Sequence, residues 1–333
     1  MNNIKLFFYS LFILSTTSFA QSYAPPAGQP GTTAMHKDSS AFVAWATGIE
    51  VKRGYVQLSD TTKQHEGSNY ATFGDPAIVL GKPSGSTTDA VSLGDGGWAI
   101  LTFDGVIKNE QGWDFAVFEN AVTDDFLELG FVEVSSDGEH FFRFPAHTEV
   151  PFTTQINGFG STDCRYIHNF AGKYKVGFGT PFDLDDLPDT TLLDKNAVRY
   201  VKIIDVVGSI DPQYASYDAY GNIVNDPFPS PFYSSGFDLT GIGAIHFEQD
   251  TSLAVNKLTT TAFKVYPTIL DDHLTIQSSI HFEYQLFSIT GDLIDRGTGF
   301  SGETTLDVHS LKSGVYILVV EGEKERKVVR LVK

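Results

Sequence analysis

Short runs of alternating apolar and polar residues recur along most of this chain, separated by turns rich in glycine, asparagine and aspartate, and this pattern predicts β-strands. Residues 115–118 are apolar on both faces, which predicts a strand buried on both sides. Residues 131–135 alternate, which predicts a half-buried strand, and residues 198–207 are dense in β-branched side chains. Because no long stretch repeats apolar residues with a helical period, we expect an all-β fold.

The strand pattern divides the chain into a long first part and a short second part. We expect residues 38–248 to form a jelly-roll-like β-sandwich and residues 263–333 to form a small immunoglobulin-like β-sandwich. Residues 249–262 are predicted to link them. Residues 21–37, which contain three prolines, are predicted to be a flexible leader. A polar cap before residues 41–46 predicts one short helix there.

The first 20 residues have the pattern of a secretory signal peptide. Lys5 precedes an apolar run over residues 6–14, and Ser18 and Ala20 supply the small residues of a cleavage site before Gln21. The apolar run is too short to persist as a membrane-spanning helix. We therefore expect export to the periplasm and no transmembrane segment in the mature chain.

Negative charge is concentrated in the first part of the chain. The formal net charge is -18, and residues 21–262 alone carry 31 acidic and 14 basic residues, a net of -17. Such a surface repels phosphate backbones and attracts cations, so nucleic acid is excluded as a partner. Cys164 is the only cysteine, which excludes an intramolecular disulfide.

The end of the chain carries three short motifs and a basic terminus at residues 324–333. The motifs are Val265-Tyr266-Pro267, Ser288-Ile289-Thr290-Gly291 and Leu311-Lys312-Ser313-Gly314-Val315-Tyr316. Residues 263–333 thereby resemble the C-terminal sorting domain of the type IX secretion system of Bacteroidetes. The usual opening of that family is Tyr-Pro-Asn-Pro, whereas Thr268-Ile269 follow Tyr266-Pro267 here. The resemblance implies that the type IX machinery carries the protein across the outer membrane, where it loses this domain and is attached to the surface or released.

Two further resemblances concern the first part of the chain. Residues 131–138 and 199–203 are similar to segments of discoidin-type, galactose-binding-like jelly rolls, which implies the same sandwich fold. Residues 114–120 resemble a segment found in uncharacterised secreted bacterial surface proteins, which implies no particular chemistry.

Oxygen-bearing side chains are frequent in the predicted loops and at strand ends. Ca²⁺ takes six to eight oxygen ligands, and irregular loops between strands can supply them. The candidate ligands of a structural Ca²⁺ are Glu119, Asn120, Asp183, Asp205, Asp218, Asp226 and Asp238. The alternative is that these residues form turns and solvated rims, because aspartate and asparagine are favoured in turns without any metal.

A long predicted loop, residues 208–235, is unusually aromatic. Its candidate ligand-binding residues are Tyr214, Tyr217, Tyr220, Phe232 and Tyr233, because exposed rings can stack on a sugar or another planar ligand. The alternative is that these rings fold back and cover the edge of the sandwich.

These features favour a secreted, non-enzymatic surface protein that binds a glycan or another small ligand, with loops stabilised by Ca²⁺. Gly-x-Ser-x-Gly and His-Glu-x-x-His motifs are absent from the sequence, and no catalytic residue is assigned. One alternative is a surface polysaccharide hydrolase that uses two carboxylates across a cleft. Another is an accessory protein that captures a ligand for a TonB-dependent outer-membrane transporter.

Overall fold

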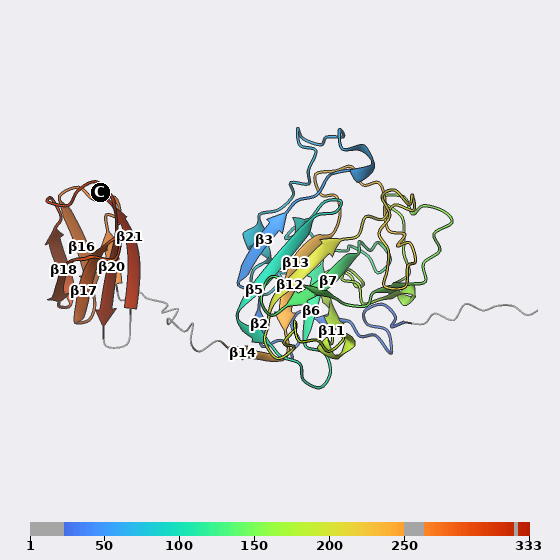
Figure 1. Ribbon diagram of the computed structural model, residues 1–333, viewed down its shortest axis with the longest axis horizontal. Coiled ribbons are helices and arrows are strands. Elements are labelled where there is room, and N and C mark those ends of the chain that lie inside the picture. The colour runs from blue at the N-terminus through green and yellow to red at the C-terminus, as the bar shows by residue number, and fades with distance from the viewer. Residues whose placement is uncertain (1–22, 250–262, 323–325) are drawn as a thin grey trace, which may run out of the picture. The chain divides into compact units, whose positions relative to one another are not determined.

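The computed structural model of the protein describes residues 23–249, 263–322 and 326–333 (Figure 1). Its regular structure is almost entirely antiparallel β-sheet, so the all-β prediction is confirmed. The chain separates into two compact units between Asp250 and Thr251. The predicted signal peptide, residues 1–20, and nearly all of the predicted linker, residues 249–262, lie outside the described residues. No helix in the described ranges is long and apolar enough to cross a membrane.

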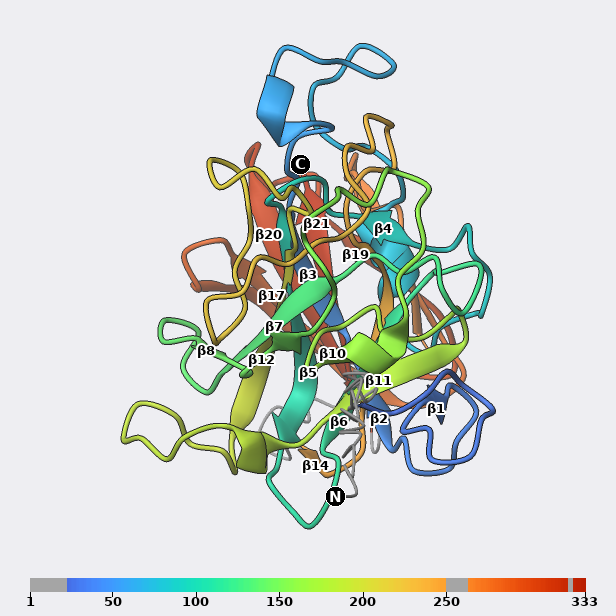
Figure 2. The same cartoon turned by 90° about the vertical axis from the view of Figure 1, so that its right-hand side faces the viewer.

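The first unit is a sandwich of two six-stranded sheets (Figures 1 and 2). In strand order, the first sheet contains β1 (Met35–His36), β11 (Phe178–Phe182), β6 (Phe115–Glu119), β13 (Asp238–Ala244) and β2 (Ala44–Trp45), with β4 (Val91–Ser92) also paired to β13. The second sheet contains β14 (Phe247–Gln249), β5 (Trp98–Ile107), β12 (Val198–Asp205), β7 (Gly130–Ser135) and β8 (Phe142–Arg143), with β3 (Gly48–Lys52) also paired to β5.

Short elements connect these strands. They are the two-stranded ribbon of β9 (His147–Thr148) and β10 (Ile167–His168), and the 3-10 turns η1 (Leu58–Asp60), η2 (Pro76–Val79), η3 (Cys164–Tyr166) and η4 (Leu184–Asp186). Long irregular loops fill the rest of the unit, which follows from its many glycine, proline and aspartate turns.

Strand β6 is buried on both faces, as its sequence predicts. Phe115 and Val117 belong to the core between the two sheets. The ring of Phe118, on the other face, packs against Phe42 at 5.5 Å and Trp45 at 5.6 Å. The helix predicted over residues 41–46 is therefore wrong: this segment is extended, because its aromatic side chains cover the outer face of β6 and β2 pairs with β13.

In strand β7, Val132 and Val134 lie in the core and Glu133 on the opposite face, as predicted. The strand is not half-buried, however, because Phe131 and Ser135, on the face of Glu133, are buried as well. Glu133 accepts a hydrogen bond of 2.9 Å from the Nε of Arg143. The neighbouring strand β12 places Ile203 in the same core. Alternation of apolar and polar residues thus decides which face of these two strands meets the core.

One end of the sandwich collects acidic residues from both sheets. In the first sheet Glu119, the last residue of β6, pairs with Leu239 near the start of β13. In the second sheet Asp205, the last residue of β12, pairs with Gly130, the first of β7. The backbone N–H of Phe237 donates to the carboxylate of Asp205 at 2.7 Å, which joins the two sheets at this end.

The predicted flexible leader, residues 21–37, differs from the structure in its described part. The backbone N–H of Tyr23 donates to the carbonyl of Arg165 at 3.2 Å, and Met35 pairs with Gly179 of β11. Residues 23–37 are thus part of the sandwich. Proline restricts the backbone, so a proline-rich segment is readily ordered where partners for its remaining N–H groups are at hand.

The second unit is a smaller sandwich with its own core. One sheet contains β15 (Phe263–Tyr266), β16 (His273–Ser278) and β19 (Gly302–Asp307); the other contains β18 (Leu293–Gly299), β17 (Phe282–Ser288), β20 (Val315–Gly322) and β21 (Arg326–Val332). The core includes Phe263, Leu274, Phe282 and Leu318, each almost fully buried.

Candidate functional site

Six acidic side chains, here called the acidic cluster, lie at the end of the first sandwich where β6 and β12 finish. They are Asp95, Glu119, Glu128, Asp205, Asp226 and Asp238. All of these residues except Glu128 are buried. Glu128 is partly exposed, and its carboxyl group experiences the charges of Glu119, Asp205, Asp226 and Asp238. Both sheets of the sandwich therefore place negative charge in one enclosed space.

Two members of the acidic cluster have an oxygen without a hydrogen-bond partner. Glu119 accepts a bond from the backbone N–H of Ala121 at 2.7 Å through Oε2, and its buried Oε1 has no partner. Asp226 accepts a bond from the backbone N–H of Leu129 at 2.9 Å through Oδ2, and its buried Oδ1 has no partner. Buried carboxylate oxygens are normally satisfied, so these two atoms require an explanation.

Asp238 is the best-satisfied member of the acidic cluster. It accepts hydrogen bonds from the hydroxyl of Ser92 and, at 2.8 Å, from the Nδ2 of Asn120. These two bonds and the positive charge of Arg53 offset part of the rise in the pKa of Asp238 that burial causes. The guanidinium group of Arg53 itself donates to backbone carbonyls such as that of Gly74 at 2.7 Å. Asp238 is thus held by polar groups on several sides.

The enclosed space makes the charged form of these acids unfavourable. Burial raises the pKa well above its ordinary value for Glu119, Glu128, Asp205 and Asp226. Burial also raises the pKa of Asp95 to about 7 and that of Asp238 to about 6. Repulsion between neighbouring carboxylates adds to the rise for Glu119 and Glu128. These shifts favour acids that hold a proton or are bound to a cation over free carboxylates.

Five of the seven predicted metal ligands lie in the acidic cluster or beside it: Glu119, Asn120, Asp205, Asp226 and Asp238. Asp95 and Glu128 were not among the sequence candidates. In the described parts of the chain, no three histidine, cysteine, aspartate or glutamate side chains stand close enough, as placed, to hold one metal ion.

The two remaining candidates, Asp183 and Asp218, lie elsewhere and shape the backbone. Asp183 accepts the backbone N–H of Asp185 at 2.9 Å and caps η4. Asp218 accepts the backbone N–H groups of Thr148 at 3.0 Å and Asn222 at 2.8 Å. Both have the turn-forming role that aspartate commonly takes.

The five aromatic candidates of the long loop do not form a single cluster on the surface. Tyr220 is 70% exposed and meets the ring of His147 edge-on at 4.8 Å. Phe232 and Tyr233 instead pack around His65, with ring centroids at 6.1 and 5.2 Å. Tyr217 is exposed and Tyr214 is half-buried. The loop therefore supplies rings to two separate groups.

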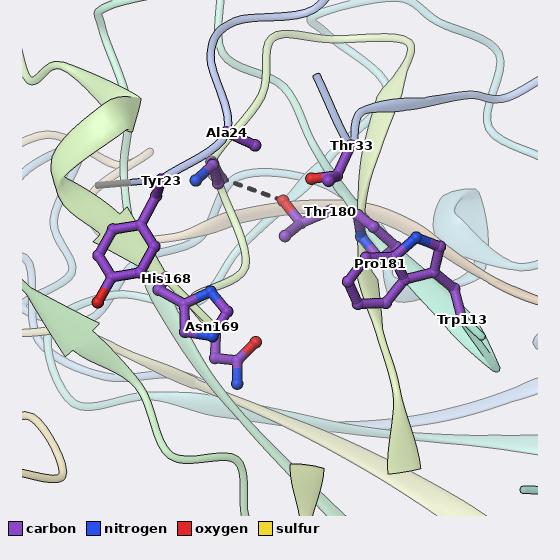
Figure 3. Close-up of a pocket in the computed structure, with 9 residues that line it drawn as sticks. Tyr23, Ala24, Thr33, Trp113, His168, Asn169, Thr180 and Pro181 are labelled. Carbon is purple, nitrogen blue, oxygen red and sulfur yellow. Dashed lines mark hydrogen bonds between the residues drawn. The ribbon is translucent and has the colours of Figure 1, made fainter. Parts of the chain in front are cut away.

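A pocket of about 200 Å³ lies beside the first of these groups (Figure 3). It is lined by Tyr23, Ala24, Thr33, Trp113, His168, Asn169, Lys173, Thr180 and Pro181. Figure 3 shows Trp113 and Pro181 on one side, and Tyr23, His168 and Asn169 on the other. The pocket therefore has aromatic walls with amide and hydroxyl groups between them.

Hydrogen bonds and ring contacts hold the pocket side chains in place. The imidazole of His168 stacks on Tyr23, whose hydroxyl contacts the Nδ1 of His147 at 2.5 Å. Asn169, at a φ of +53°, donates through Nδ2 to Asp186 at 3.0 Å, which leaves its carbonyl oxygen as an acceptor. A ligand would thus meet polar groups whose orientation is already set.

The ionisable groups of the pocket are shifted toward their neutral forms. Burial lowers the pKa of His168, so its imidazole is neutral at pH 7. Burial also lowers the pKa of Lys173 to about 8, and its ammonium group donates to the backbone carbonyl of Ile167 at 2.6 Å. No carboxylate belongs to the pocket lining among the described residues.

The residues of this pocket were not among the predicted ligand-binding residues. Tyr23 falls in the segment predicted to be a flexible leader, and His168 and Asn169 carry no motif. Trp113 directly follows the turn glycine Gly112 in the sequence, but its exposure, which is unusual for tryptophan, is visible only in the structure.

Comparison with known proteins identifies the second unit. A family model described as "Secretion system C-terminal sorting domain" matches residues 264–333. The end of the chain is therefore a type IX sorting domain, as the motifs at residues 265–267, 288–291 and 311–316 predict. A search of the curated proteins finds no match for the chain.

Solved structures similar to the chain are distant. One is PorZ, a surface component of the type IX secretion system of Porphyromonas gingivalis, at 19% identity and a TM-score of 0.21, covering 28% of this chain and 14% of PorZ. A second is the BSP domain of a biofilm-associated protein, at 10% identity and a TM-score of 0.18, covering 71% of this chain and 48% of that one. A third is a β-glucuronidase of Ruminococcus gnavus, at 12% identity and a TM-score of 0.20, covering 76% of this chain and 39% of the enzyme. The chain spans less than half the length of each of these proteins.

Proposed function

We propose that the first unit is a non-enzymatic module that binds a small neutral ligand, in the first instance one residue of a glycan, in the pocket beside Trp113. The sorting domain at residues 264–333 marks the protein for export by the type IX secretion machinery to the cell surface or the medium. The signal peptide predicted at residues 1–20 would take it first to the periplasm. Exported in this way, the module would meet ligands outside the cell.

The observation that carries the proposal is the arrangement of the pocket walls. The indole of Trp113, 37% exposed, stands opposite the stacked rings of Tyr23 and His168 (Figure 3). Apolar ring faces pack on the C–H face of a sugar, while Asn169 and Thr180 can bond its hydroxyl groups. A volume of about 200 Å³ is below the ~300–1,000 Å³ of pockets for drug-sized ligands, which favours a single small ring.

Two further features support a neutral ligand and a non-enzymatic role. The net charge of -17 over residues 21–262 disfavours anionic ligands. Glycoside hydrolysis requires two carboxyl groups across a cleft, and the described lining of the pocket contains none. Capture of a ligand for a TonB-dependent transporter is compatible with the same pocket.

The test is a screen of neutral glycans with the full chain, followed by titration of variants. We expect Trp113→Ala to weaken binding at least about tenfold, equivalent to about 1.4 kcal/mol. Phe159→Ala is the matched control, because Phe159 is 75% exposed and contacts Phe232 in the other aromatic group. The proposal is refuted if Phe159→Ala loses binding while Trp113→Ala keeps it. It is also refuted if the protein cleaves the bound glycan.

A further inference from the structure

We infer that the acidic cluster is a binding site for one divalent cation, Ca²⁺ by the chemistry of its ligands, with Glu119, Glu128 and Asp226 as the acidic ligands. This site is separate from the pocket beside Trp113, because none of these three residues lines that pocket. The inference therefore stands or falls independently of the proposed glycan binding.

The first observation is the pair of unpartnered carboxylate oxygens. Glu119 is 1% exposed and Asp226 is 3% exposed, yet Oε1 of the first and Oδ1 of the second have no hydrogen-bond partner. The other oxygen of each carboxylate accepts a backbone N–H, so both side chains are held in place with one oxygen left without a partner. A bound cation is a partner that unsatisfied carboxylate oxygens of this kind accept.

The second observation is the imbalance of charge. The electrostatic neighbours that act on Glu128 are four other carboxylates, those of Glu119, Asp205, Asp226 and Asp238. Arg53 acts on Asp238, and three of its five guanidinium N–H groups donate to backbone carbonyls rather than to a carboxylate. Buried charge of one sign is unfavourable unless it is paired or bound to a metal.

The ligand types point to a hard cation. The acidic cluster offers carboxylate oxygens, and Asn120, which donates through Nδ2 to Asp238 and to the carbonyl of Thr87, keeps its amide oxygen for an ion. Carboxylate, amide and backbone oxygens in an irregular loop suit Ca²⁺, which tolerates varied geometry. Mg²⁺ requires a near-octahedral shell and loses water reluctantly.

Glu128 is the ligand that must move. As the side chains are placed, no three acidic groups in the described residues meet at one point, so the site is not closed. The side chain of Glu128 accepts no hydrogen bond from the described residues, and the residue is partly exposed. Its side chain can therefore rotate onto an ion held by Glu119 and Asp226 without breaking another bond.

The experiment is calorimetric titration of the full chain with CaCl₂ after treatment with a chelator. We expect one Ca²⁺ per chain, with a Kd no weaker than the ~10⁻⁴–10⁻³ M of extracellular modules, and a higher thermal midpoint with Ca²⁺. Glu128→Gln and Asp226→Asn should each weaken Ca²⁺ binding at least about tenfold. Glu139→Gln, at an exposed residue, is the charge-matched control and should bind as the unchanged chain does.

Two results would overturn the inference. In the first, the unchanged chain shows neither a heat of binding nor a shift of its thermal unfolding midpoint at about 10 mM Ca²⁺, which would mean that the acids are neutralised by protons. The other is Ca²⁺ binding that survives in Glu128→Gln and Asp226→Asn, which would place the ion elsewhere. If Asp226→Asn fails to fold, Glu128→Gln and the titration of the unchanged chain still decide the question. Titration with MgCl₂ distinguishes the two cations.

Discussion

The imidazole ring of His168 lies flat against the phenol ring of Tyr23, with centroids 4.8 Å apart and planes inclined by 7°. His168 lies in β10, directly across from His147 in β9, and the hydroxyl of Tyr23 reaches that second histidine. Tyr23 therefore joins the segment before β1 to the ribbon of β9 and β10, and forms one wall of the pocket at the same time.

Two substitutions of Tyr23 separate these roles. Tyr23→Phe removes only the hydroxyl, so we expect a loss of about 0.5–1.5 kcal/mol in the free energy of unfolding and an intact pocket wall. Tyr23→Ala also removes the stacked ring, so we expect a loss of about 2–3 kcal/mol and at least about tenfold weaker ligand binding. Urea unfolding and ligand titration measure the two effects. Equal behaviour of the two variants would mean that the ring stack contributes nothing.

The pKa of Asp95 gives the stability a definite pH dependence when Ca²⁺ is removed by a chelator. An unfolded aspartate titrates near ~3.9, whereas burial raises the pKa of Asp95 in the folded chain to about 7. Between these values the folded chain holds a proton that the unfolded chain has released. Raising the pH from about 4 through about 7 therefore lowers the stability, and lowering it restores the stability.

Asp95→Asn tests this dependence. The amide oxygen can still accept the backbone N–H of Leu58, which lies 2.7 Å from Oδ2 of Asp95. We expect the variant to exceed the free energy of unfolding of the unchanged chain by about 1.5 kcal/mol near pH 5, and by about 4 kcal/mol near pH 8. Urea titrations at both pH values in chelator measure the difference, with Glu139→Gln as control. A variant that is less stable at pH 8 would contradict the sign of this argument.

The sorting domain predicts where the protein accumulates. Deletion of residues 263–333 removes the segment that the type IX machinery reads, so we expect the truncated chain to stay in the periplasm. Immunoblots of cell fractions and protease treatment of intact cells report the location. The full chain carrying Trp113→Ala is the control and should reach the surface, because its sorting domain is unchanged. Surface display of the truncated chain would show that the address lies elsewhere.

The strands of the core could be predicted from sequence because their signal is local. In β6 the apolar residues on both faces predict that both are buried, and they are. In β7 the alternation correctly puts Val132 and Val134 in the core but does not predict that Phe131 and Ser135 are buried too. The sorting domain was equally accessible, because its motifs are short and contiguous. The segment at residues 41–46 was mistaken for a helix because the partner of its aromatic residues, Phe118, is distant in the chain.

The candidate sites depend on contacts between distant segments, and their prediction was correspondingly incomplete. Glu119 and Asp226 were named from their residue type, but nothing local separates them from Asp183, which caps a turn. Glu128 was missed because only the folded chain brings its carboxyl group under the influence of the other acids. Tyr23 was missed because a proline-rich segment has the same composition whether it is free or docked.

Gly172 and Gly177 offer a matched test of how tightly the loop carrying Glu128 is held. Both have a left-handed backbone, with φ of +83° and +84°. A Cβ at Gly177 would meet nothing within 4 Å, whereas a Cβ at Gly172 would lie 1.9 Å from the backbone oxygen of Glu128. Gly177→Ala therefore carries only the conformational cost, about 1–2 kcal/mol.

Gly172→Ala should lower the free energy of unfolding by about 1–3 kcal/mol more than Gly177→Ala does, because the backbone at Glu128 would have to move away. If Glu128 is a Ca²⁺ ligand, the same displacement should weaken Ca²⁺ binding in Gly172→Ala and leave it unchanged in Gly177→Ala. Urea unfolding in chelator gives the first comparison, and calorimetric titration gives the second. Equal unfolding free energies for the two variants would show that the loop yields freely, and the close packing at Gly172 would then have no influence on the acidic cluster.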